Sequence, residues 1–259
     1  MTKKQQNKFT NSFTVDKLPK WKCPTCKEVP LTCEKIKSYE SPSSLSCRHE
    51  KNLQSFEKWG IFAGLLKCTN CLEQIVVSGN MQGNFQRRKY VDEDLFEERE
   101  IIVDVEELVP THFNPPIHIF DINKGVPKEI KDEIINAFKL YWLDQNACAN
   151  KIRIAVEKIM DNKKVRKTFL TNSRKRKRFS AHERIELFKK TNPKVANLLE
   201  AIKWIGNAGS HNERYLTKED VLFGFDMLKL ATEKLYDKGE SEIIKKSKVI
   251  NKRKKPIGG

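Results

Sequence analysis

Residues 127–142 have the sequence PKEIKDEIINAFKLYW, and this stretch marks the point where the chain changes from extended to helical spacing. Its apolar side chains recur every three or four positions, as on one face of a helix, and Pro127 suits a first helical turn. Comparable stripes follow at residues 148–160, 195–205 and 221–235, the last preceded by Thr217 and Asp220 in the spacing of a capping box. The pattern predicts an up-and-down helical bundle over residues 127–240.

Upstream of residue 127, the sequence favours short extended segments. Residues 23–90 hold six of the seven cysteines and short β-like runs without a long helical stripe. Residues 91–126 begin acidic and continue with apolar runs and prolines, which argue against helix and predict an extended connector. Polar, lysine-rich sequence flanks these parts, as a basic arm at residues 1–22 and as a basic tail at residues 241–259 that we expect to be disordered.

Two Cys-x-x-Cys pairs predict a metal site in residues 23–90. Cys23 and Cys26 form the first pair, and Cys68 and Cys71 form the second. Two such turns that face each other place four thiolates in a tetrahedral set, which suits zinc and leaves no open coordination position. We therefore expect a structural zinc in a small β-rich zinc-ribbon domain, with the 41 residues between the pairs as an insertion.

The insertion contains three further potential ligands, Cys33, Cys47 and His49. They could belong to a second or rearranged metal site, or they could fill the core of this small module. A redox role for the Cys-x-x-Cys pairs would require a thioredoxin-like βαβ context, which the sequence lacks.

The chain carries 50 lysines and arginines against 34 aspartates and glutamates, a formal charge of +16. The excess lies at the two ends and in residues 147–180, where one basic block consists of Arg174, Lys175, Arg176, Lys177 and Arg178. Such a block is typical of a surface that binds a polyanion and also of a solvated loop, so both interpretations stay open. No apolar run is long enough for a membrane span and no secretory signal opens the chain, which predicts a cytoplasmic protein.

Residues 198–211, LLEAIKWIGNAGSH, are the most informative part of the helical region. Asn207 and His211 are four residues apart and share a helix face, and Lys203 precedes Asn207 by the same interval. The residues between them are small, which leaves space for another helix or a ligand to approach closely. A glycine-rich helix end with a capping histidine is the alternative interpretation.

From about Phe113 to Asp237, the sequence resembles the domain-of-unknown-function family 4145, a branch of the HEPN superfamily (higher eukaryotes and prokaryotes nucleotide-binding). The resemblance rests on stretches that occur in the family's order and cover nearly half of the chain. They are Phe113-Asn114-Pro115-Pro116, Pro127-Lys128-Glu129-Ile130, residues 149–157 (ANKIRIAVE), His182-Glu183-Arg184-Ile185, residues 206–211 (GNAGSH) and the helix at residues 220–236. The resemblance implies a helical bundle that pairs as a homodimer, in a bacterial protein associated with restriction and phage-defence genes.

Many HEPN proteins are metal-independent ribonucleases, so the resemblance also implies a candidate catalytic site. His211 and Asn207 match the histidine and polar positions of the family's motif, and Gly206 stands where the motif has an arginine. The resemblance implies proton transfer by His211 and charge stabilisation by a nearby cation, for which Lys203, Arg153 and Arg214 are candidates. Enzymatic activity is therefore left open.

Taken together, these features predict a mainly α protein, in which a small β-rich zinc-ribbon domain precedes a HEPN-like helical bundle. We expect the protein to engage RNA or DNA in a bacterial defence setting, and to cleave RNA if His211 is catalytic. Two alternatives remain. One is a non-catalytic dimerisation or adaptor module that works with partner proteins of a larger defence complex, and the other is a zinc-ribbon regulator that binds DNA.

Overall fold

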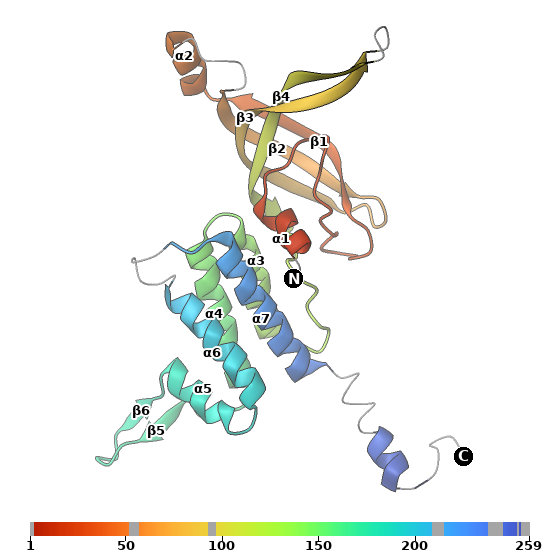
Figure 1. Cartoon of the computed structure of the whole chain (residues 1–259). Helices are drawn as coiled ribbons and strands as arrows, with labels where there is room; N and C mark the ends of the chain where they lie inside the picture. Colours follow the sequence, from red (N-terminus) through yellow and green to blue (C-terminus); the bar gives the residue numbers. More distant parts are fainter. Residues whose placement is uncertain are drawn as a thin grey trace. The chain divides into compact units, whose positions relative to one another are not determined.

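The computed structural model of the chain forms two compact units, Met1–His118 and Ile119–Gly259 (Figure 1). It describes residues 3–51, 57–92, 97–208, 215–237, 246–252 and 254. In this part of the chain, none of the helices combines the length and the apolar character that a bilayer crossing requires.

The first unit is built on a four-stranded antiparallel sheet in the order β1-β2-β3-β4. Its elements are α1 (Lys3–Thr10), β1 (Leu31–Glu40), α2 (Pro42–Lys51), β2 (Trp59–Cys68), β3 (Gln74–Asp92) and β4 (Glu97–Asn114). Strand β3 pairs with β2 only as far as Gln82, whereas its pairing with β4 continues to Asp92. The far halves of β3 and β4 therefore form a two-stranded arm that extends beyond the rest of the sheet (Figure 1).

Between Ile75 and Met81 in β3, buried positions alternate with exposed or half-buried ones, as expected when one face of a sheet is buried. The buried side chains include Phe62, Leu66, Ile75, Val77, Met81 and Leu108. Trp21 is fully buried and packs edge-to-face against Phe13 and Phe113, with ring centroids 5.3 and 5.0 Å apart. Its indole N–H donates to the backbone carbonyl of Lys8 at 2.7 Å, which ties α1 to the core. The segment 1–22, expected as a polar arm, thus supplies part of the core of this unit.

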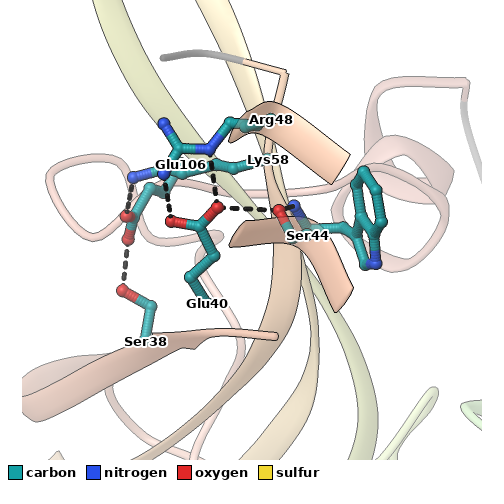
Figure 2. A network of polar contacts seen from close by, with 7 residues as sticks. Ser38, Glu40, Ser44, Arg48, Lys58 and Glu106 are labelled. Carbon is teal, nitrogen blue, oxygen red and sulfur yellow. Dashed lines mark hydrogen bonds and ion pairs between the residues drawn. The ribbon is translucent and has the colours of Figure 1, made fainter. Parts of the chain in front are cut away.

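A polar network joins the two outermost strands of the sheet (Figure 2). The hydroxyl of Ser38 in β1 donates to the carboxylate of Glu106 in β4, and Lys58 donates to the same carboxylate at 2.6 Å. Strands β1 and β4 lie at opposite ends of the sheet order. This contact therefore requires the sheet to curl until its two edges approach each other.

The same network holds α2 against the end of β1. Glu40, the last residue of β1, accepts hydrogen bonds from the hydroxyl of Ser44 and from the guanidinium of Arg48, at 2.7 Å each (Figure 2). Ser44 is fully buried and also accepts from the backbone N–H of Trp59 at 3.1 Å. These bonds connect the start of β2 to the end of β1 through α2.

In its described part, the second unit contains six helices and a small hairpin. Its elements are α3 (Lys128–Tyr141), α4 (Gln145–Asn162), β5 (Thr168–Leu170), β6 (Arg176–Arg178), α5 (Ala181–Lys189), α6 (Pro193–Ala208) and α7 (Lys218–Tyr236). Its core contains an aromatic cluster in which Phe225 lies 5.3 Å from Phe138 and 6.1 Å from Tyr141, measured between ring centroids. Thr217 and Asp220 cap α7 reciprocally, which confirms the expected capping box. Residues 246–252 form a further helix with exposed side chains.

The expected fold class, mainly α with a small β-rich zinc ribbon before a HEPN-like helical bundle, is wrong. The four strands of the curled sheet have 10, 10, 19 and 18 residues, and the segment expected as a connector contains β4. A hairpin, β5–β6, contains the basic block, for which a solvated loop was one interpretation. The long strands were not predicted because apolar and charged residues do not alternate along the arm. This alternation is missing because the arm has no buried side in its described part.

The position of β4 in the core can be tested with two substitutions in this strand. Leu108 is fully buried, whereas Ile102 in the arm is 65% exposed. We expect Leu108→Ala to lower the free energy of unfolding by about 2–5 kcal/mol, because it leaves a cavity, and Ile102→Ala to change it by less than about 0.5 kcal/mol. Chemical denaturation of the full chain measures both. Equal, small effects would place β4 outside the core.

Candidate functional site

The four cysteines of the two Cys-x-x-Cys pairs come together in the first unit. All four sulfur atoms lie within 4.8 Å of one another, with Cys23 Sγ 3.6 Å from Cys71 Sγ and Cys26 Sγ 3.5 Å from Cys68 Sγ. A tetrahedral site with metal–sulfur bonds of about 2.3 Å spaces its sulfurs about 3.8 Å apart. The cluster therefore has the size and the donor set to hold a metal ion.

The two pairs sit on the same kind of backbone turn. The N–H of Lys27 donates to the carbonyl of Cys23 at 3.0 Å, and the N–H of Leu72 donates to the carbonyl of Cys68 at 3.0 Å. Lys27 and Leu72, each directly after the second cysteine of its pair, have φ of 64° and 61°. Each turn folds back on itself and so presents its two thiols to the other turn.

Two of the four thiols, those of Cys26 and Cys71, have pKa values that are shifted in opposite directions. A hydrogen bond from the backbone at Glu28, with further ones from Asn70 and neighbouring thiols, lowers the pKa of Cys26 to about 6 against the effect of desolvation. At Cys71, the hydrogen bond from the backbone at Glu73 acts to lower the pKa, but desolvation and the three neighbouring thiols raise it to about 12. A bound cation would supply the positive charge that lets all four sulfurs ionise together.

The other candidate ligands of the first unit do not join this cluster. Cys33 lies half-buried in β1, and desolvation raises the pKa of its thiol, while Cys47 and His49 lie in α2. Among the described residues, one other group of potential ligands has its atoms close together, namely His182, Glu186 and Glu200 in the second unit. That group is largely exposed, and such clusters are common without a metal.

Helix α6 carries two of the predicted catalytic residues, Lys203 and Asn207. Lys203 is buried, and its ammonium lies 3.6 Å from the ring centroid of Trp204, whose side chain is 59% exposed. Asn207 is half-buried near the end of the helix. His211 and Arg214 lie outside the described residues, so the pairing of Asn207 with His211 and the catalytic roles of these residues stay predictions.

Arg153 of α4 packs over Gly206 of α6, which explains why position 206 has no side chain. A methyl group at Gly206 would stand 2.7 Å from Arg153 Cβ and 3.1 Å from the carbonyl oxygen of Ala149. The guanidinium of Arg153 donates to Glu157 at 2.7 Å and to Asn150 at 3.1 Å. Arg153, a candidate to replace the arginine that the family's motif has at position 206, thus lies directly against Gly206.

The predicted basic block forms the turn and the second strand of the β5–β6 hairpin. Arg174, with φ of 56°, donates its N–H to the carbonyl of Thr171 at 2.8 Å, and the hydroxyl of Thr171 donates to the carbonyl of Lys175 at 3.1 Å. All five cations, from Arg174 to Arg178, are exposed. Strand β5 places the uncharged residues Thr168, Phe169 and Leu170 opposite β6, so the hairpin itself provides no acid for them.

Asp161 near the end of α4 anchors both ends of this hairpin. This role of Asp161 was not predicted from the sequence. Its carboxylate accepts from Lys167 before β5 at 2.8 Å and from Arg184 in α5 at 2.7 Å. Burial acts to raise the pKa of Asp161, but these two hydrogen bonds outweigh it and lower the pKa below its ordinary value. The only local signal was an arginine beside Ile185 on the buried side of a short helix.

The four-cysteine cluster makes a prediction about metal content. Protein purified without added metal should carry about one metal ion per chain, and a Cys68→Ser, Cys71→Ser double variant should lose it and become less stable, because metal binding contributes to folding. Elemental analysis and thermal denaturation measure the two effects. The matched Cys33→Ser, Cys47→Ser variant should keep its metal. Unchanged metal content in the first variant would contradict the assignment.

Two helical glycines make a prediction about the contact between α4 and α6. Gly206→Ala should destabilise the protein by about 1–3 kcal/mol, because the methyl group overlaps Arg153 and the backbone of Ala149. In α7, a methyl group at Gly224 meets nothing closer than 3.7 Å. Gly224→Ala should therefore stabilise by up to about 1 kcal/mol through helix propensity. Denaturation curves that give both variants the same sign would refute the close approach at Gly206.

Two family models match the chain. Residues 136–253 match the Domain of unknown function (DUF4145), and residues 11–113 match the Domain of unknown function (DUF8608). The first match confirms the resemblance of the helical region to family 4145, and each match lies within one of the two compact units. No curated protein and no solved structure gave a significant match to the chain.

Proposed function

We propose that this protein binds nucleic acid through phosphate contacts made by the β5–β6 hairpin. The observation that carries the proposal is the block of five consecutive cations, Arg174 to Arg178, which are all exposed and none of which forms an ion pair within the described chain. A cation that is not neutralised by its own protein gains most from a polyanion, because each phosphate contact releases condensed counterions.

The charge of this hairpin differs from that of an ordinary solvated surface. In α3, for comparison, the exposed Lys128 and Lys131 are interspersed with Glu129, Asp132 and Glu133, so that opposite charges cancel along the helix. In the hairpin the five cations follow one another without an intervening acid. A short, hydrogen-bonded hairpin also holds these side chains with less conformational freedom than a loop, which reduces the entropy cost of binding.

Lysine and arginine on a hairpin of this kind contact phosphates, and phosphates carry no base sequence. The proposed activity is therefore binding of RNA or DNA with weak sequence preference. We propose that Cys23, Cys26, Cys68 and Cys71 hold zinc, because four thiolates in tetrahedral spacing are a typical structural zinc set with no open position for chemistry.

The proposal predicts the salt dependence of binding. A Lys175→Gln, Arg176→Gln, Lys177→Gln variant should bind a mixed-sequence oligonucleotide more weakly, and the slope of log affinity against log salt should fall by about 0.7–0.9 for each phosphate that the variant no longer neutralises. Fluorescence anisotropy at several salt concentrations measures the slope. The matched Lys128→Gln, Lys131→Gln, Lys139→Gln variant removes the same charge from α3 and should keep most of the slope. An equal fall of the slope in both variants would show that net charge alone sets the salt dependence. The hairpin would then not be the binding surface.

A further inference from the structure

A cavity of about 420 Å³ lies between α4, the β5–β6 hairpin and α5. Six of the residues that line it are charged: Arg153, Glu157, Asp161, Lys167, Arg178 and Arg184. The volume lies in the range of small-molecule sites in proteins, which begin at about 300 Å³. The cavity joins two groups that the sequence analysis had kept apart, since Arg153 was a catalytic candidate and Arg178 belonged to the basic block.

The lining has four cations and two carboxylates, a surplus of two positive charges. Each carboxylate is already engaged: Glu157 accepts from Arg153 at 2.7 Å, and Asp161 accepts from Lys167 and Arg184. These bonds hold the cations in place around the cavity. Arg178 forms no ion pair within the described chain, so its charge is available to a ligand.

Arg184 is the unusual member of this group. It is only 7% exposed, and its two hydrogen bonds, to Asp161 and to the carbonyl of Val165, both come from Nη2. Its Nε–H has no acceptor within the described chain. A buried donor without an acceptor is costly, and most buried polar groups in proteins are satisfied. Because Nε is itself shielded from solvent, the donors left for a ligand are those of Nη1, to which the described chain also offers no acceptor. A guanidinium with unused donors at the wall of a positively charged cavity favours an anionic ligand.

We propose that this cavity binds a phosphate monoester, carried by a free nucleotide or by the end of a nucleic-acid strand. A monoester carries close to two negative charges at pH 7, which equals the surplus of the lining, whereas a phosphate within a strand carries one. Phe179, stacked on Phe169 with ring centroids 4.6 Å apart, adds an aromatic surface to the lining. The strand-end form of this inference rests on the proposed function, because the hairpin that would hold the strand forms one wall of the cavity.

The test uses the full chain and one oligonucleotide prepared with a 5′-phosphate, with a 3′-phosphate or with hydroxyl ends. A second arm compares a nucleoside monophosphate with its nucleoside by calorimetry. We expect the terminal phosphate to tighten binding of the strand or of the mononucleotide by about tenfold, the gain expected from a charge-assisted hydrogen bond. A gain confined to the mononucleotide identifies the free nucleotide as the source of the monoester, and a gain with one strand end identifies that end.

Three variants locate the effect. Arg178→Gln should abolish the gain from the phosphate, and it tests the cavity without disturbing the core because Arg178 is exposed. Lys128→Gln removes the same charge from α3, which neither lines the cavity nor belongs to the hairpin, and should preserve the gain. Arg184→Lys, which keeps the charge but removes the fork of donors, should weaken the gain.

Equal affinity for phosphate and hydroxyl forms in both arms, or an undiminished gain in Arg178→Gln, would overturn the proposal. Failure of the proposed function has a different result. In that case the hydroxyl-ended strand does not bind through the hairpin, while the comparison of the mononucleotide with its nucleoside still decides whether the cavity holds a monoester.

Discussion

The candidate binding surface depends on the hydrogen bonds that the carboxylate of Asp161 accepts. This carboxylate holds Lys167 at the start of the hairpin and the buried guanidinium of Arg184 beyond its end, and thereby fixes the hairpin between α4 and α5. Without this carboxylate, Arg184 would be a buried charge without a partner, which is strongly destabilising in proteins. The depressed pKa of Asp161 means that its contribution to stability is complete above the ordinary pKa of an aspartate and is lost as pH falls through the lower value.

The two units are stabilised in different ways. The helical unit has a continuous apolar core that includes Phe138 and Phe225, and capping boxes close the starts of α5 and α7. The sheet unit has a smaller core around Trp21, and the described side chains of its β3–β4 arm bury little. Its four clustered thiols lie at the turn between β2 and β3 and at the loop before β1, where a metal would join two segments that are distant in sequence. The cysteine cluster and the proposed binding surface therefore lie in separate units.

Most of the features that could be predicted from the sequence follow from local patterns. The apolar stripes of the long helices and the capping box at Thr217 depend on residues close together in the chain. The two Cys-x-x-Cys pairs are far apart in sequence, but each pair is a local motif of metal ligands, and this chemistry predicts that the pairs meet. The fold class was wrong because the arm of β3 and β4 lacks the alternation that marks a half-buried strand. The pairing of Asp161 with Arg184 joins residues 23 apart in sequence, and no local signature marks such a contact.

The central claim is that nucleic acid contacts the β5–β6 hairpin and the cavity beside it. Ultraviolet cross-linking of the wild-type protein to a bound oligonucleotide, followed by mass spectrometry of the digested protein, tests this contact without any substitution. The account predicts cross-linked peptides from residues 162–184, with Phe169 and Phe179 among the modified positions. Cross-links confined to the sheet unit, with the peptides of the hairpin recovered unmodified, would contradict it.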